Sequence, residues 1–399
     1  MGEENEIACV TGAGGYQASW LVKLLLLRGY KVHGTVRDLS NEKNAHLKTL
    51  ENAAENLQLF KADLLDFDGL LKAIDGCSSV FHVACHVPST TLQNPEVEMI
   101  RPALEGTCNV LKARSIAKVK RVVMVSSIPH WPKDQVMDEK CWSEKEFCKT
   151  CEIEGFSWIN WYSYAKTEAE FQAFEYAKAH GLDLVSVCLS LIIGPLLQPK
   201  MNTGTLLLLN FTRDGVEAAE NNDWMAMDVR DVAEALLLVY KKPEALGRIL
   251  EQGVICKFSS EKLQKLGWRY RALETSIVDS IEDFYEKEVE DGLGEERREK
   301  REEQKEKKKK GDDFVFGGPE TKSSLGKGRT RGRGQTGPAG PVQTSLGNLP
   351  TGLVAVCVRQ LNADPGTSKS KGKEVCIRVP TRRVVSGHFH AEETLPDVG

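Results

Sequence analysis

The feature that most constrains the fold is an alternation of two kinds of segment through the first 287 residues. Longer amphipathic runs with helical apolar spacing occupy residues 16–27, 65–74, 95–116 and 164–179. Between them lie short runs rich in β-branched residues, at 6–11, 31–36, 57–60, 79–83, 121–125 and 182–188. Because strands separated by helices pair in parallel through right-handed crossovers, this alternation predicts a doubly wound α/β sheet.

The composition changes abruptly near residue 288. Residues 286–310 are mostly charged in mixed blocks, and residues 311–399 are rich in Gly and Pro without an apolar period. Such a segment lacks the apolar surface that would offset the entropy of ordering it. We therefore predict a disordered tail over 288–399 that can be removed without unfolding the rest. The remainder divides into a nucleotide-binding core, 1–190, and a smaller substrate-side lobe, 191–287.

Composition and charge exclude several classes of protein. The formal net charge of −4 argues against a surface that binds nucleic acid or anionic lipid throughout. A short Gly-Arg run at 328–334 allows an RNA contact as a weaker alternative to a solvated linker. The eleven Cys show no CxxC or paired-His spacing, so we expect no metal site. An acidic N-terminus and an apolar stretch too short to span a bilayer, 185–197, predict a cytoplasmic protein without a membrane segment.

A glycine-rich turn, TGAGGYQA, follows the first strand and opens a long apolar helix. Its small positions, Gly12, Gly15 and Ala18, fit the pattern G-x-x-G-x-x-A rather than the stricter G-x-G-x-x-G. Such a turn brings backbone N–H groups and a helix N-terminus against a pyrophosphate. We therefore predict that Gly12, Gly14, Gly15 and Tyr16 bind a dinucleotide; the alternative is a tight turn without a ligand.

The end of the second strand carries a cation where an NAD-selective site would place an acid. Arg37 suits a ribose 2′-phosphate, which favours NADP, whereas Asp38, one residue later, would suit the 2′-hydroxyl of NAD. Lys43 is a second possible phosphate contact, although a solvated surface lysine is the simpler interpretation from the residues alone.

Three residue types typical of carbonyl reduction occur downstream. The fifth strand ends in Ser126 and Ser127, at the edge where open α/β sheets bind their ligands. Tyr162 and Lys166, spaced four apart at the start of a predicted helix, share one face. A hydride acceptor needs a proton at its oxygen, so we expect the Lys cation to lower the phenol pKa and a Ser hydroxyl to bind the oxygen. The alternative is a Tyr–Lys pair packed on a helix surface.

The runs that carry these residues resemble a known family. They include VTGAGGYQASWLVKLLLLRGY, TVRD, KNAHL, KADLLDFD, VFHVA, EGTCNVLKA, VVMVSS, DEKCWSEKEFC, NWYSYAK, IIGPLLQP and DVRDVAEALL. Over residues 6 to about 287 the chain resembles the plant cinnamoyl-CoA reductase and dihydroflavonol reductase family of extended short-chain dehydrogenases. The resemblance implies an extended Rossmann fold, NADPH as hydride donor, Ser127 as the catalytic hydroxyl, Tyr162 as the proton donor and Lys166 as the residue that activates Tyr162 and holds the nicotinamide ribose.

The resemblance also implies a set of cofactor contacts. Arg37 and Lys43 match the 2′-phosphate contacts of the family, which raises Lys43 above the solvated-lysine interpretation. The remaining matches are the adenine contacts, Asp63 and Leu64, and the strand end beside the cofactor, Val83 and Ala84.

The implied substrate is a small molecule of phenylpropanoid type. NWYSYAK is close to the NWYCYGK signature of cinnamoyl-CoA reductases, which implies a CoA thioester that is reduced to an aldehyde with release of coenzyme A. Several positions differ from the family: Leu189 replaces a Pro, residues 200–215 lack a His, 129–132 replaces a longer apolar run, and the stretch after Leu250 is shortened. These differences favour a reductase-like relative with a reduced C-terminal lobe. The alternative is a non-catalytic nucleotide-binding protein, a paralogue or the product of an altered gene, that acts through interactions.

Overall fold

The computed structural model describes the parts of the chain that form its core. These are residues 6–85, 92–128, 138–143, 148, 158–213, 226–250, 260–290, 353–360 and 373–380. Two segments at which the sequence departs from the family, 129–132 and 251–259, lie outside the described residues.

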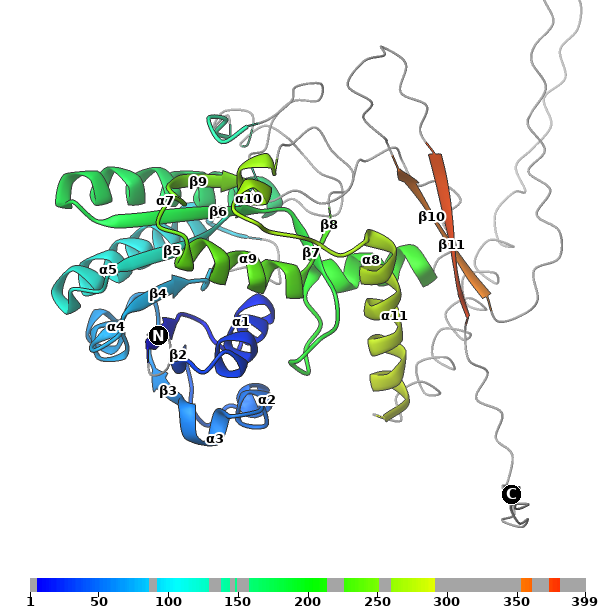
Figure 1. The fold of residues 1–399 in the computed structure, drawn as a ribbon, viewed down its shortest axis with the longest axis horizontal. Coiled ribbons are helices and arrows are strands. Elements are labelled where there is room, and N and C mark those ends of the chain that lie inside the picture. Colours follow the sequence, from blue (N-terminus) through cyan, green and yellow to red (C-terminus); the bar gives the residue numbers. More distant parts are fainter. Residues whose placement is uncertain are drawn as a thin grey trace, which may run out of the picture. The chain divides into compact units, whose positions relative to one another are not determined.

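A seven-stranded sheet forms the centre of the fold (Figure 1). Its order is β3-β2-β1-β4-β5-β6-β9, and every pairing between neighbours is parallel. The chain reverses direction across the sheet between β1 and β4, which creates the crevice where such sheets bind nucleotides. The predicted doubly wound sheet is confirmed. Its strands are β1 (Ile7–Val10), β2 (Lys31–Val36), β3 (Leu57–Lys61), β4 (Ser79–His82), β5 (Arg121–Ser127), β6 (Asp183–Leu189) and β9 (Gly247–Leu250).

Helices cover both faces of the sheet, as Figure 1 shows. One face packs against α1 (Tyr16–Leu27) and α9 (Val229–Lys241), and the other against α4 (Phe67–Ile74), α5 (Arg101–Ala117) and α7 (Trp158–His180). Two separate apolar cores result, one on each face. This arrangement explains why the strands are apolar at consecutive positions rather than at alternate ones.

Strand β5 illustrates how one strand serves both cores. Val123 and Val125 are buried in the core beside α1 and α9, whereas Val122 and Met124 are buried in the core beside α4, α5 and α7. Because successive side chains of a strand point to opposite faces, a run of four apolar residues is needed to fill the two layers. The strand then ends in two serines at the carboxyl edge of the sheet.

Three predicted helices have different bounds in the structure, and the one predicted for 65–74 begins two residues later, at Phe67. The helix predicted for 95–116 is a π-helical turn over Glu96–Ile100 that continues into α5. Helix α7 begins at Trp158, six residues before the predicted start, so Tyr162 lies within its first two turns. Smaller elements complete the region: a 3-10 turn (Glu42–Asn44), α2 (Ala45–Lys48), α3 (Ala53–Asn56), α8 (Thr203–Arg213), α10 (Glu261–Lys265), α11 (Leu273–Glu290), and a parallel pair formed by β7 (Leu191–Ile193) and β8 (Ala226–Asp228).

The segment predicted as the substrate-side lobe, 191–287, also completes the Rossmann sheet. It supplies β9, which pairs with β6, and α9, which packs with α1. Helix α11 buries Ile277, Ile281 and Phe284. The proposed boundary at residue 190 stays a prediction.

The C-terminal region contains two described strands, β10 (Leu353–Gln360) and β11 (Lys373–Pro380), which form a two-stranded sheet. These strands and the last three residues of α11 lie within 288–399, where we predict disorder, and the rest of that range lies outside the described residues. Within the part of the chain that the structure describes, no helix is both long enough and apolar enough to cross a membrane.

Candidate functional site

The glycine turn is held in a shape that only small residues allow. Gly12 has a φ of +67°, and its N–H donates to Thr35 Oγ1 over 2.9 Å. A Cβ placed on Gly12 would lie 3.0 Å from the Cβ of Ala84, and one on Gly14 would collide with the side-chain oxygen of Asn44. Two of the predicted cofactor-binding positions therefore cannot carry a side chain without displacing a neighbour.

The N-terminus of α1, which follows the turn, has no side-chain cap. Gly15 is the N-cap residue of α1 and provides no side-chain cap, although its N–H donates to the carbonyl oxygen of Gly12 over 2.9 Å. The first N–H groups of a helix lack partners within the helix and carry a partial positive charge. An uncapped N-terminus after a glycine turn is the structural context that supports pyrophosphate binding.

Tyr16 ties this turn to the neighbouring sheet. Its phenol donates to the carbonyl oxygen of Gly194 over 2.8 Å, immediately after β7. Burial, followed by the negative charge of Asp228, raises the pKa of Tyr16 well above its ordinary value. The phenol thus acts in this structure as a neutral hydrogen-bond donor to the backbone.

The strand end formed by Val83 and Ala84 is fixed to the glycine turn by Thr11. The Oγ1 atom of Thr11 accepts the N–H groups of both residues, each over 3.0 Å. With its acceptor positions used, the Thr11 hydroxyl donates to His82 Nδ1 (3.1 Å), so His82 carries its proton on Nε2 and donates to Thr107 Oγ1 (3.2 Å). Sequence reasoning missed Thr11, His82 and Thr107.

His82 is held in its neutral form. It is buried, and burial followed by the positive charge of Lys166 lowers the pKa of the imidazole from 6.5 to about 3. A neutral ring is what the network needs, because one nitrogen accepts a hydrogen bond and the other donates one.

The two cations predicted to select NADP follow β2, Arg37 directly and Lys43 in the 3-10 turn Glu42–Asn44. Arg37 is exposed and, among the described residues, belongs to no ion pair. Lys43 is half-buried, and its carbonyl oxygen accepts His46 Nδ1 over 2.9 Å. Asp38, the competing acid, accepts hydrogen bonds from the hydroxyl and N–H of Ser40, which lower the pKa of its carboxyl group. Its oxygen Oδ1 therefore already has two donors.

The predicted adenine contacts lie just beyond β3. Asp63 is exposed, and its Oδ1 accepts the N–H of Leu65 over 3.0 Å. The carbonyl oxygen of Leu64 accepts Asn109 Nδ2 (3.0 Å), and the side chain of Leu64 packs so closely on Gly106 that a Cβ there would come within 2.7 Å of it. Helix α5 therefore fixes Leu64 in place.

The catalytic candidates come from β5 and α7, which pack together. Lys166 is buried on α7, and its Nζ donates to the carbonyl oxygen of Val125 on β5 over 2.6 Å. Ser126 donates to Glu170 over 3.0 Å, and Ser127, the next residue, is the last residue of β5. The structure thus brings the Tyr162–Lys166 face alongside the end of β5, two residues from Ser127.

The environment of Tyr162 differs from the sequence expectation. We predict a phenol pKa lowered by Lys166, but burial, followed by the charge of Cys85, raises the pKa of Tyr162 well above its ordinary value. Tyr162 packs with Met99 and Ile100. The ammonium of Lys166 is engaged by Val125, so helical spacing alone did not determine where the cation points. Tyr162 keeps its proton through the neutral range.

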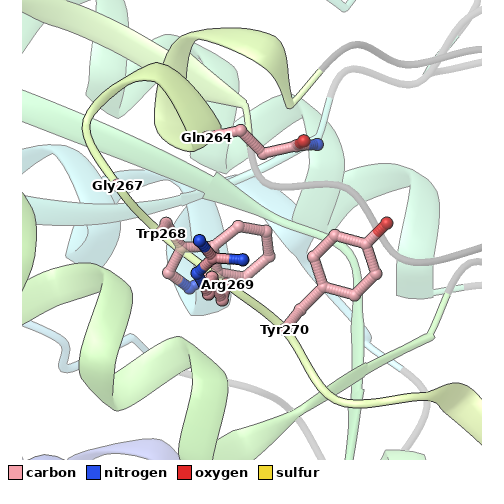
Figure 2. A pocket seen from close by; sticks show the side chains of 5 residues that line it. All are labelled: Gln264, Gly267, Trp268, Arg269 and Tyr270. Carbon is pink, nitrogen blue, oxygen red and sulfur yellow. The ribbon is translucent and has the colours of Figure 1, made fainter.

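A separate surface pocket of about 410 Å³ lies at the loop between α10 and α11 (Figure 2). None of the predicted site residues lines it. Within the loop, Trp268 Nε1 donates to the carbonyl oxygen of Asp231 and the Trp268 ring contacts Tyr270 at 5.2 Å between centroids. Among the residues described, no group of three His, Cys, Asp or Glu side chains gathers as a metal site would require.

Comparisons of the sequence and of the fold identify known proteins that are similar to this chain. Residues 8–251 match the model of the NAD dependent epimerase/dehydratase family. The chain is 39% identical to cinnamoyl-CoA reductase 1 of Petunia hybrida over 321 residues, covering 71% of this chain and 93% of that protein. The crystal structure of vestitone reductase from alfalfa superposes with a TM-score of 0.60 at 25% identity, covering 70% of this chain and 98% of that one. Yeast methylglyoxal/isovaleraldehyde reductase Gre2, solved with NADPH, has the same fold, with a TM-score of 0.58 at 21% identity over 71% of this chain and 99% of that one.

Proposed function

Because this chain belongs to the NAD dependent epimerase/dehydratase family, and its curated relatives are reductases, we propose that it reduces a carbonyl compound or CoA thioester of phenylpropanoid type with NADPH. The observation that carries the proposal is the position of α7. Lys166 on this helix donates to Val125 on β5, two residues before Ser127, on the sheet whose first turn is suited to a dinucleotide.

Three residues of this chain have separate roles in the proposed reduction. NADPH, when bound, supplies a hydride to the electrophilic carbon. Tyr162 delivers its phenolic proton to the substrate oxygen as negative charge develops there, and Ser127 donates a hydrogen bond to the same oxygen. Lys166, whose ammonium donates to the carbonyl oxygen of Val125, holds α7 against β5 and so positions Tyr162. With a thioester, the resulting hemithioacetal loses coenzyme A as its thiol and leaves an aldehyde.

The cofactor end of the site is proposed to bind the 2′-phosphate through Arg37 and Lys43. Asp63 and Leu64 lie at the end of the adjacent strand, where the adenine would bind, while Val83 and Ala84 border the turn. The uncapped N-terminus of α1 and the packed glycines, Gly12 and Gly14, support a dinucleotide at this edge.

We expect Arg37→Ala to weaken NADPH binding by about 10- to 100-fold. This loss corresponds to the roughly 1.5–3 kcal/mol of a charge-assisted hydrogen bond. NADH binding should change little, because NADH lacks the 2′-phosphate. Fluorescence titration of both cofactors measures the two affinities. Lys31→Ala, which removes an exposed cation at the opposite end of β2, is the matched control. Equal affinities of the parent chain for NADPH and NADH would overturn the assignment.

A substrate panel tests the proposed reaction. The chain is incubated with NADPH and a hydroxycinnamoyl-CoA thioester, a hydroxycinnamaldehyde or a dihydroflavonol, and loss of absorbance at the nicotinamide band is followed. Reduction of the thioester with release of free thiol supports the thioester assignment, and reduction of only the other two supports a carbonyl reductase. Binding of NADPH without reduction of any of them would favour the non-catalytic alternative.

A further inference from the structure

One helical turn beyond the catalytic pair, a buried acid joins three elements of the fold. Glu170 follows Tyr162 and Lys166 at intervals of four residues, so the three share one face of α7. Only 1% of the Glu170 side chain is exposed. Its Oε2 accepts the hydroxyl of Ser126 over 3.0 Å, and its Oε1 accepts the thiol of Cys188 over 3.3 Å. Glu170 thus connects α7 to the ends of β5 and β6.

The charge partner of Glu170 comes from the edge strand. Arg248 on β9 donates through Nε to Glu170 Oε1 over 3.0 Å, and only 7% of its side chain is exposed. Its Nη1 donates to the carbonyl oxygens of Glu139 (3.1 Å) and Cys141, while its guanidinium lies 3.9 Å above the ring of Trp142. The guanidinium therefore bridges the catalytic helix and the segment 138–143.

The segment 138–143 lies in the chain between Ser127 and Tyr162. Arg248 binds two of its carbonyl oxygens, and Thr167 on α7 donates to Ser143 at its end over 2.8 Å. Two neighbouring residues of β5 are also held against α7: Lys166 binds Val125, and Glu170 binds Ser126. Ser127 follows directly, so its position relative to Tyr162 depends on these contacts.

Filling the interior of the protein does not require a buried ion pair such as Glu170–Arg248. A buried ion pair loses the hydration of both groups, and replacing the pair by apolar residues of similar volume is often neutral or stabilising. The specific contribution of Glu170 and Arg248 is geometric, because together they bind a hydroxyl, a thiol and two carbonyl groups from separate parts of the chain.

We propose that Glu170 and Arg248 are positioning residues for the reduction, which hold the segment 138–143 and Ser126 against α7 and so set Ser127 relative to Tyr162. This proposal rests on the proposed function. It goes beyond it by assigning a role in the reaction to two residues that do not touch the reacting atoms.

Three variants of the full chain separate positioning from stability. Glu170→Gln and Arg248→Met each leave one buried charge or polar group without its partner, so the melting temperature should fall. Glu170→Gln combined with Arg248→Met removes both charges and should recover most of that temperature. We expect kcat of the double variant to stay at least about 10-fold below the parent value, with the KM for NADPH within about threefold. A double variant with the melting temperature and kcat of the parent would overturn the proposal.

Hydrogen exchange gives a readout that does not depend on turnover. With NADPH added, amides of 138–143 and of the first two turns of α7 should exchange at least about 10-fold faster in the double variant than in the parent, while amides of α4 serve as the unchanged reference. If the parent reduces no compound of the panel, the proposed function is wrong. The hydrogen-exchange rates alone then test whether Glu170 and Arg248 hold the segment 138–143. Unchanged exchange at 138–143 would show that the pair does not hold this segment.

Discussion

Tyr162→Phe is expected to lower the rate of reduction at least about 100-fold while NADPH still binds. The substitution keeps the aromatic ring, and with it the packing against Met99 and Ile100, but removes the only proton that the phenol can deliver. Because burial raises the pKa of Tyr162, the phenol is protonated throughout the neutral range and available as an acid. Steady-state kinetics with the substrate identified by the panel measure kcat, and fluorescence titration measures NADPH affinity.

Tyr164→Phe is the matched control for this experiment. Tyr164 is also partly buried beside Met99 and Ile100, but it lies two residues further along α7 and therefore on a different face of the helix. We expect Tyr164→Phe to keep the parent rate. A parent chain that reduces its substrate and a Tyr162→Phe variant that is equally active would show that another group provides the proton.

The sheet was predictable because its signal is local. Each strand is a short apolar run buried on both faces, and each helix shows an apolar period, so the alternation of the two determines a parallel topology. The candidate catalytic residues were identified from similar local signals, because Tyr162 and Lys166 are four residues apart on a helix and Ser127 ends a strand. Lys166 lies against β5, where its ammonium donates to the carbonyl oxygen of Val125, a contact that the spacing did not predict.

The partners that fix the site were not predictable, because they are distant in the sequence. Glu170 and Arg248 are 78 residues apart, and Thr11 and His82 are 71 apart, so no local pattern links them. One local signal was available: Glu170 extends the spacing of Tyr162 and Lys166 by a further four residues. The direction of the Tyr162 pKa shift was also inaccessible, because it depends on burial and on the charge of Cys85, which is distant in the sequence.

The second large expected effect is a loss of folding stability at low pH, caused by His82. Burial lowers the pKa of His82 from 6.5 to about 3, so the unfolded chain binds a proton at His82 that the folded chain excludes. The contribution of neutral His82 to stability is therefore fully present above pH 6.5 and is lost as the pH falls from 6.5 toward 3. At 1.36 kcal/mol per pKa unit, the loss reaches about 2 kcal/mol at pH 5 and on the order of 4–5 kcal/mol near pH 3.

His82→Gln isolates this effect, because an amide can accept one hydrogen bond and donate another but does not titrate in this range. We expect the variant to be less stable than the parent at pH 7.5, and this difference to shrink by about 2 kcal/mol at pH 5, measured by chemical unfolding at each pH. Contributions of the other groups, including His33, whose pKa is raised by its hydrogen bond with Cys77, cancel in the comparison. His180→Gln, at an exposed position near the end of α7, is the control substitution. A stability difference between parent and His82→Gln that is constant from pH 7.5 to 5 would mean that folded His82 binds its proton as readily as the unfolded chain does, and it would overturn the assignment of His82 as a buried neutral ring.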